Sequence, residues 1–145
     1  MEKDKQIIIG SDHAAFELKE KIKDLLAGLG YEVEDAGTHS TASVNYADFG
    51  KKVAQAVSDG TFGRGILLCG TGLGMSIQAN RFKGVRAALC SDIFSARMSR
   101  QHNDANILVM GGRVIGDILA FELVREWLAT PFEGGRHLDR IRSLD

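Results

Sequence analysis

The sequence contains a single proline, only two cysteines and almost no excess charge, since its formal net charge is −1. Neither Cys69 nor Cys90 belongs to a CxxC pair or to the Cys/His spacing of a zinc site, so we expect two reduced thiols and no metal. A net charge near zero provides no overall field that would attract nucleic acid or a membrane surface. An anionic ligand would therefore have to be held by a local group of basic residues.

Long hydrophobic runs are also missing, because no apolar run approaches the roughly 20 residues that cross a bilayer. The segment Met1-Glu2-Lys3-Asp4-Lys5 leads directly into a strand-like Ile7-Ile8-Ile9, without the pattern of a signal peptide. These absences predict a cytoplasmic protein that does not bind membranes. What is present is an ordinary globular composition, 44% hydrophobic and 26% charged, which predicts a single domain over residues 1–145.

Five short apolar runs alternate with longer amphipathic stretches. The runs are typical of strands buried on both faces, and they cover 6–10, 31–36, 65–69, 85–90 and 106–110. The stretches are typical of helices, and they cover 14–29, 46–58, 73–81, 92–101 and 117–129. This alternation predicts a Rossmann-like α/β domain of three layers, with a five-stranded parallel sheet between two layers of helices. A turn at Pro131 precedes the basic segment 136–142, which we expect to form a C-terminal helical tail.

The most informative segment follows the third predicted strand, where Cys69 precedes Gly70-Thr71-Gly72-Leu73-Gly74. In open parallel sheets, ligands bind beyond the carboxyl ends of the strands, and this segment lies at such an end. Glycines let backbone N–H groups approach an anion, and the start of a helix adds a positive dipole end. Such surroundings favour a thiolate, so Cys69 is a candidate base. The alternative is a small buried residue that closes the strand.

Other anion-binding loops do not fit this segment. A P-loop needs a Lys-Ser/Thr pair, which is missing, and the last position of a GxGxxG motif that begins at Gly72 is Ile77. A phosphatase-type Cys-x5-Arg loop fails as well, because its arginine position after Cys69 is Met75. The segment therefore favours chemistry at the thiol over nucleotide binding.

Polar residues at other element ends have both a structural and a functional interpretation. Asp12 follows the first predicted strand and can cap the next helix, while His13 beside it could donate to a sugar hydroxyl or a phosphate. His102 and Asn103 close the fourth predicted helix, where polar residues are common, but they also offer an acid/base group with an adjacent amide donor. The local sequence leaves both interpretations open.

Arginine is the residue whose geometry best suits phosphate. Arg136 and Arg140 are four residues apart, so they share one face if the tail is helical, and Arg113 follows a glycine pair after the fifth predicted strand. Their alternative role is that of solvated surface charges. His39 and His137 offer no comparable functional argument.

Five segments, in order and with plausible spacing, carry a likeness to one family: Gly10-Ser11-Asp12-His13, Gly37-Thr38-His39, Cys69-Gly70-Thr71-Gly72-Leu73-Gly74, Ser99-Arg100-Gln101-His102-Asn103-Asp104-Ala105-Asn106 and Gly134-Gly135-Arg136-His137. Together they resemble type B ribose-5-phosphate isomerases, whose superfamily also contains galactose-6-phosphate isomerases. The resemblance runs over nearly the whole chain, and its most specific parts are the Cys-Gly-Thr-Gly and Arg-Gln-His-Asn-Asp segments.

The resemblance implies an aldose–ketose isomerase of carbohydrate metabolism, in the pentose phosphate pathway, that needs no metal or organic cofactor. A base removes the proton from C2 of the opened sugar, and a cis-enediolate forms before the proton returns to C1. In the matching positions, Cys69 is the base, while Thr71 and His102 assist ring opening. The enediolate oxygen is steadied by Gly70, Gly72, Gly74 and Asn103. The hydroxyls, ring and phosphate of the sugar are contacted by Asp12, Tyr46, His13, Arg113, Arg136 and Arg140.

Members of this family are dimers or tetramers, so the resemblance implies a homodimer or homotetramer with active sites between subunits, to which the neighbour contributes the His102–Asn103 and arginine side. The sequence departs from the family at Asn45-Tyr46-Ala47, where Asp-Tyr-Pro is common. The loop therefore lacks a carboxylate and a stiff proline, which leaves its rigidity and the substrate preference open. The segment Gly74-Met75-Ser76 lacks the glutamate base of some relatives and indicates the cysteine-base branch.

Two other functions stand beside ribose 5-phosphate isomerisation. A six-carbon substrate such as allose 6-phosphate or galactose 6-phosphate would use the same catalytic parts. A non-catalytic sensor of sugar phosphates or nucleotides would keep the anion loop and the arginines, but it would not need Cys69, Thr71 and His102 together. Exchange of substrate hydrogen with deuterated water would distinguish a sensor, which shows none, from an isomerase.

Overall fold

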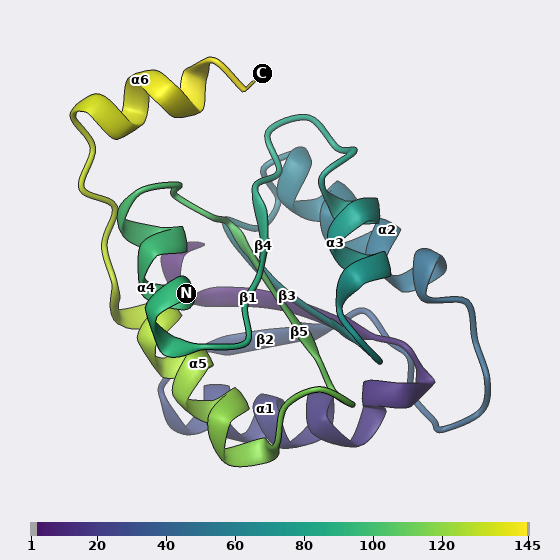
Figure 1. Ribbon diagram of the computed structural model, residues 1–145. Helices are drawn as coiled ribbons and strands as arrows, with labels where there is room; N and C mark the ends of the chain where they lie inside the picture. The colour runs from purple at the N-terminus through teal and green to yellow at the C-terminus, as the bar shows by residue number, and fades with distance from the viewer. Residues whose placement is uncertain (1–2, 145) are drawn as a thin grey trace.

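The computed structural model describes residues 3–144 and contains a five-stranded sheet in which all paired strands are parallel (Figure 1). From one edge to the other, the strands are β2 (Glu32–Asp35), β1 (Gln6–Ser11), β3 (Arg64–Cys69), β5 (Ile107–Gly111) and β4 (Ala87–Leu89). This sheet confirms the predicted α/β class. Residues 1, 2 and 145, at the ends of the predicted domain 1–145, lie outside the described residues.

Helices cover both faces of the sheet, which gives the three predicted layers (Figure 1). One face is covered by α1 (Phe16–Gly28), α4 (Ile93–Gln101) and α5 (Asp117–Ala129), and the other by α2 (Tyr46–Ser58) and α3 (Leu73–Ala79). The tail forms α6 (Arg136–Arg142), as expected, and short 3-10 helices occupy Lys3–Lys5 and His13–Ala15. Within residues 3–144, no helix has the length and apolar character needed to cross a membrane.

Each face of the sheet has its own hydrophobic core, because successive side chains of a strand point to opposite faces. Ile7 and Ile9 of β1 pack on the side of α1 and α5, whereas Ile8 packs on the side of α2 and α3. Full burial of one such side chain contributes roughly 1.5–3 kcal/mol, so this alternation fixes the face of each strand residue. It places Cys69, the last residue of β3, in the core under α2 and α3.

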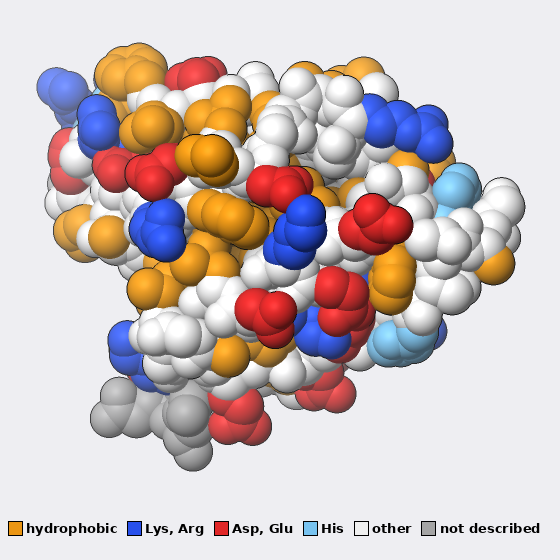
Figure 2. Space-filling view, turned by 90° about the horizontal axis from the view of Figure 1, so that it is seen from below, with side chains coloured by type: hydrophobic (Ala, Val, Ile, Leu, Met, Phe, Trp, Pro, Cys, Tyr) orange, Lys and Arg blue, Asp and Glu red, His pale blue; other side chains and the backbone are white. Residues whose placement is uncertain are grey.

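The outer surface of α1 and α5, seen from below in Figure 2, carries charged side chains of both signs interspersed with hydrophobic ones. Lys21 of α1 pairs with Asp117 of α5 across this surface, with 2.5 Å between nitrogen and oxygen. Such mixed charge fits the net charge of −1, and this face carries no field of a single sign.

The two edge strands differ from the expectation that all five strands are buried on both faces. β2 is exposed at alternate residues, and β4 is partly exposed throughout, because each has a neighbour on one side only. β4 is also shorter than the predicted 85–90. On its outer side, the amide of Asn80 pairs with both the N–H and the C=O of Ala87, at 2.8 and 3.0 Å, where a further strand would pair.

The strand order places a crevice between β1 and β3, since the chain leaves β1 toward one edge for β2 and returns on the other side for β3. Ligands of open parallel sheets bind at such switch points. The register pairs Ser11 with Leu68, so Asp12 and Cys69 follow side by side at the carboxyl ends of the two strands. The fold therefore brings together residues that lie far apart in the sequence.

Candidate active site

A cavity of about 260 Å³ opens beyond the carboxyl ends of β1, β3 and β5. Its walls come from the loops that follow these strands and from the start of α2. The lining residues are Asp12, His13, Ala14, Tyr46, Cys69, Gly70, Thr71, Gly74 and Arg113. The structure thus gathers in one place the site residues that the sequence predicted at the strand ends.

Cys69 lies at the floor of this cavity and is only 5% exposed. The N–H of Gly72 donates to its Sγ at 3.2 Å, so a backbone donor faces the sulfur. Gly72 itself has φ 82°, and a Cβ there would lie 2.5 Å from Cδ1 of Leu89 and 3.1 Å from the carbonyl carbon of Met110. Glycine is therefore required at this position, because it provides both the left-handed backbone and the close packing that aim the N–H at the thiol.

The rest of the glycine loop leaves backbone donors available. The N–H of Leu73 is occupied by Oγ1 of Thr71 at 3.2 Å. The N–H groups of Gly70 and Thr71 have no hydrogen-bond partner among residues 3–144. Two unengaged donors beside a buried sulfur form a place where an oxyanion of a ligand can be stabilised.

Tyr46, the first residue of α2, forms another wall of the cavity that contains Cys69. A Cβ at Gly74 would lie 2.5 Å from Cζ of Tyr46, so the phenol ring covers the glycine directly. The helix is capped by Asn45, whose Oδ1 accepts from the N–H of Ala47 at 3.0 Å. The asparagine thus performs the capping that a carboxylate would perform at this position, and the missing carboxylate does not leave the start of α2 uncapped.

Asp12 and His13 are each held by the backbone. Oδ1 of Asp12 accepts from the N–H groups of Ala14 and Ala15 at 3.0 and 3.3 Å, which confirms the capping interpretation. Nδ1 of His13 accepts from the N–H of Val44 at 3.1 Å. A neutral imidazole that accepts at Nδ1 carries its proton on Nε2, so His13 keeps a donor for the cavity that it lines.

Arg113 reaches the cavity from the loop after β5. Its backbone N–H donates to the carbonyl of Gly70 at 2.9 Å, and its Cδ would lie 3.5 Å from a Cβ at Gly70. No carboxylate among residues 3–144 forms an ion pair with its guanidinium. The backbone of Arg113 is therefore held at the glycine loop, where its exposed side chain offers a cation that no carboxylate of residues 3–144 pairs with.

A second group of predicted residues lies elsewhere. The helix α4 returns from the carboxyl end of β4 to the amino end of β5. His102 and Asn103, which follow α4, therefore lie at the amino ends of the strands, opposite to Cys69. Arg136 and Arg140 are on α6, which Figure 1 shows beyond α4, apart from the helices that cover the sheet. Within one chain, the structure does not bring these four residues to the cavity of Cys69.

Around His102 the structure adds two residues that sequence reasoning missed. The rings of His102 and His137 stack, with centroids 4.3 Å apart, and Nε2 of His102 lies 3.8 Å from a carboxylate oxygen of Glu133. Burial, followed by the electrostatic influence of the neighbouring His102 and Arg136, lowers the pKa of His137. The sequence contained a signal for His137 in the Gly-Gly-Arg-His segment, but Glu133 carried none.

Arg100 fixes the end of α4 that presents His102. Its guanidinium is buried and donates to the carbonyl of Ala105 at 2.6 Å and to Oδ1 of Asp104 at 2.9 Å. Its Nε lies 3.3 Å from the carbonyl of Thr130, which ties α4 to the segment that leads to α6. The Arg-Gln-His-Asn-Asp segment therefore contains a structural arginine beside its candidate functional residues.

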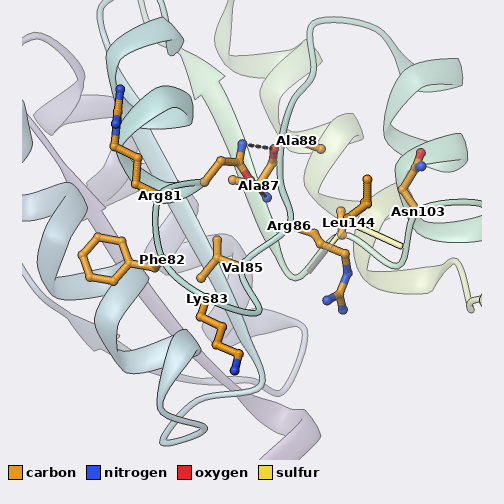
Figure 3. A pocket seen from close by; sticks show the side chains of 11 residues that line it. Arg81, Phe82, Lys83, Val85, Arg86, Ala87, Ala88, Asn103 and Leu144 are labelled. Atoms are coloured by element: carbon orange, nitrogen blue, oxygen red, sulfur yellow. Dashed lines mark hydrogen bonds between the residues drawn. The ribbon is translucent and has the colours of Figure 1, made fainter. Parts of the chain in front are cut away.

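A larger cavity, of about 670 Å³, lies beside β4 and is lined by Asn103, Arg86 and Leu144 among others (Figure 3). Its most central cation is engaged, since Nε of Arg86 donates to the carbonyl of Asp104 at 2.9 Å. Figure 3 shows Arg81 and Lys83 pointing away from Asn103. The polar side chains of this larger cavity therefore do not point toward a common place where a ligand could bind. We place the candidate active site at Cys69.

Several known proteins are similar to this chain in sequence and structure. Residues 7–144 match the model of the family described as Ribose/Galactose Isomerase. The chain is 47% identical to Ribose-5-phosphate isomerase B of Escherichia coli, over 97% of this chain and 94% of that protein. It is 43% identical to a D-erythrulose-4-phosphate isomerase of Pectobacterium atrosepticum, over 95% and 91% of the two chains. The crystal structure of a ribose 5-phosphate isomerase of Thermotoga maritima superposes with a TM-score of 0.94 at 60% identity, covering 97% of each chain.

Proposed function

Because the chain belongs to the ribose/galactose isomerase family and is a sugar-phosphate isomerase, we propose that it interconverts ribose 5-phosphate and ribulose 5-phosphate through a cis-enediolate, without a metal or organic cofactor. The observation that supports this most directly is the buried Cys69 sulfur beside unengaged N–H groups in the cavity. A base next to an oxyanion cradle is what proton transfer at carbon requires.

In the proposed reaction, the thiolate of Cys69 removes the C2 proton of the open-chain aldose. The electron pair of the broken C–H bond forms the C1–C2 double bond, and the negative charge moves to O1. The N–H groups of Gly70 and Thr71 stabilise that charge, and loss of one such donor typically lowers kcat by roughly 10²–10³-fold. The thiol then returns the proton to C1, while the O2 proton passes to O1 and the carbonyl forms at C2.

The remaining residues of the cavity bind the sugar in this proposal. Asp12 has an oxygen that is not used in capping and accepts from a sugar hydroxyl. His13, through Nε2–H, and Arg113 donate to the phosphate, while Tyr46 packs against the carbon chain. The phosphate is far from C1 and C2, so its binding energy serves to position the reacting carbons.

We propose that the second group acts in the cavity of another subunit. His102, Asn103, Arg136 and Arg140 lie at the opposite edge of their own sheet, so a homodimer, alone or within a homotetramer, is required to bring them to Cys69. Exposed apolar side chains that a partner could cover support this assembly, and they are Leu73, Ile77, Leu89, Ile93 and Phe94. In this arrangement His102 assists ring opening, and Arg136 and Arg140 complete the phosphate site.

A shorter substrate is the second candidate. Two relatives with 43% and 45% identity are a D-erythrulose-4-phosphate isomerase and a 4-deoxy-4-sulfo-D-erythrose isomerase, so four-carbon substrates occur near this sequence. The catalytic parts would be the same, and only the distance between the reacting carbons and the anionic group would differ.

The test is a comparison of kcat/KM in the presence of a chelator, with ribose 5-phosphate, erythrulose 4-phosphate, allose 6-phosphate and galactose 6-phosphate as substrates. We expect the highest value for ribose 5-phosphate, with formation of ribulose 5-phosphate. Preference for another sugar would retain the chemistry and overturn the five-carbon assignment. If none of the four sugars exchanges a carbon-bound hydrogen with deuterated water, the isomerase mechanism is overturned.

A further inference from the structure

The cluster of His102, Glu133 and His137 brings together three groups that can bind a metal. One ligand atom from each lies within 4.8 Å of the other two. The residues come from the end of α4, the segment after α5 and the start of α6. Two backbone hydrogen bonds hold these segments in place. The N–H of Glu133 donates to the carbonyl of Gln101 at 3.1 Å, and the N–H of His137 donates to the carbonyl of Gly134 at 3.2 Å. The convergence is therefore built into the fold of this chain.

The donor set has a definite chemical preference. Two imidazoles and a carboxylate form the three-ligand set that Zn²⁺ uses when a fourth position is left to water. His137 is 8% exposed, and burial together with the neighbouring His102 and Arg136 lowers its pKa, which favours the neutral imidazole. Neutral imidazole is the form that binds a metal.

The ring geometry requires one adjustment before both histidines can bind one ion. The two rings are nearly parallel, with an interplanar angle of 11°, so their nitrogens lie alongside one another. His102 can turn, because its side chain is 41% exposed, and Glu133 is 46% exposed and equally able to move. His137 is the fixed member of the cluster, and the other two close around the ion.

The charges around the cluster decide which cations fit. Arg136 and Arg140 act on His137 as positive charges, and Glu133 opposes them there. A hard cation such as Mg²⁺ or Ca²⁺ depends on several oxygen ligands and would gain little. A cation held by coordination to nitrogen, such as Zn²⁺, Co²⁺ or Ni²⁺, depends less on the surrounding field.

We propose that His102, Glu133 and His137 form an inhibitory site for a divalent transition metal of the Zn²⁺ type. Binding takes His102 out of the position from which it would reach the sugar, so the bound metal lowers isomerase activity. The binding site stands on the geometry of this chain alone. Its inhibitory effect rests on the proposed function, because it assumes that His102 takes part in the reaction.

The binding test uses the full chain after treatment with a chelator and removal of the chelator. Zn²⁺ is titrated by calorimetry, and Co²⁺ by its visible absorption, which reports the ligand geometry. Variants Glu133→Gln and His137→Asn should each weaken binding by at least the roughly 10–100-fold that loss of an outer-shell partner costs. Glu133→Gln keeps the test valid if the buried His137 variant does not fold. His39→Asn, which removes an exposed imidazole elsewhere, and Cys69→Ser, which removes the thiol, should bind as the wild type does.

Each outcome decides part of the proposal. Unchanged affinity in both cluster variants, or equal loss in His39→Asn or Cys69→Ser, would overturn the site. Tight binding of Mg²⁺ would overturn the assigned metal class. Zn²⁺ that binds at the cluster but leaves isomerisation unchanged would overturn the inhibitory role. If the chain isomerises none of the sugars tested, calorimetry still decides the site, and the proposed function fails separately.

Discussion

The carboxyl ends and the amino ends of the strands, which we call the carboxyl edge and the amino edge of the sheet, hold different kinds of candidate residues. At the carboxyl edge, loops after three neighbouring strands form a cavity in which backbone hydrogen bonds fix Asp12, His13 and Cys69. At the amino edge, His102 lies at the end of α4, where its ring stacks on His137 and its Nε2 lies 3.8 Å from Glu133. The first edge provides, within one chain, a buried thiol beside backbone N–H groups that have no partner among residues 3–144. The second places His102 away from the cavity of Cys69, which is why we propose that it acts in the cavity of another subunit.

Replacement of Cys69 gives the largest expected effect and tests the carboxyl edge alone. Cys69→Ala should lower kcat by about 10⁴-fold, the upper end of what a general base contributes, because no other base lies in the glycine loop. Exchange of the C2 hydrogen with deuterated water should fall in parallel. Affinity for inorganic phosphate should stay as in the wild type. Activity equal to that of the wild type would remove Cys69 from the mechanism.

Replacement of His102 tests whether the amino edge serves another subunit. His102→Asn should lower kcat by about 10²-fold, since ring opening loses its acid/base group while C2 deprotonation is retained. Hybrids formed by mixing this variant with Cys69→Ala should regain roughly a quarter of the wild-type sites, because half of the dimers carry one site with both native residues. No recovery in verified hybrids would show that the two edges do not meet across the interface.

Replacement of Gly74 tests how tightly the carboxyl edge is packed. Gly74→Ala should destabilise the protein by about 1–3 kcal/mol, as overpacking does, because the new Cβ would lie 2.5 Å from the Tyr46 ring. Urea unfolding measures the change. The double variant with Tyr46→Ala should show a smaller combined loss than the sum of the single losses. Gly28→Ala is the matched control, since nothing lies within 4 Å of its Cβ, and it should not lose stability.

The smallest expected effect concerns the cap that holds Tyr46 at this edge. Asn45→Ala should destabilise the protein by about 1 kcal/mol, because the N–H of Ala47 loses its acceptor. Asn45→Asp keeps an acceptor at the same place and should be as stable as the wild type in the same denaturant titration. If both variants lose the same stability, the cap is not what orders this wall of the cavity.

Much of the fold was predictable because it depends on local patterns. The segments 46–58 and 117–129 coincide with α2 and α5, since their apolar spacing and their ends are marked in the sequence. The strand-end residues around Cys69 were predictable as one site, because parallel strands end at one edge. β4 was predicted too long because Val85 and Cys90, which flank it, are buried in the hydrophobic cores without belonging to the strand. His137 and Glu133 were missed because they come close to His102 only when the tail packs against the end of α4. That contact joins segments about 30 residues apart, which a local pattern does not reveal.

The pairing of Asn80 with β4 has a consequence for the behaviour of the chain at high concentration. An exposed edge strand is a template on which strands of other molecules can add and start aggregation. The side-chain amide of Asn80 occupies both backbone groups of Ala87 and so acts as a one-residue substitute for a sixth strand. Because these two backbone groups of β4 are already hydrogen-bonded, a strand of another molecule cannot pair with them, which opposes strand addition at this edge.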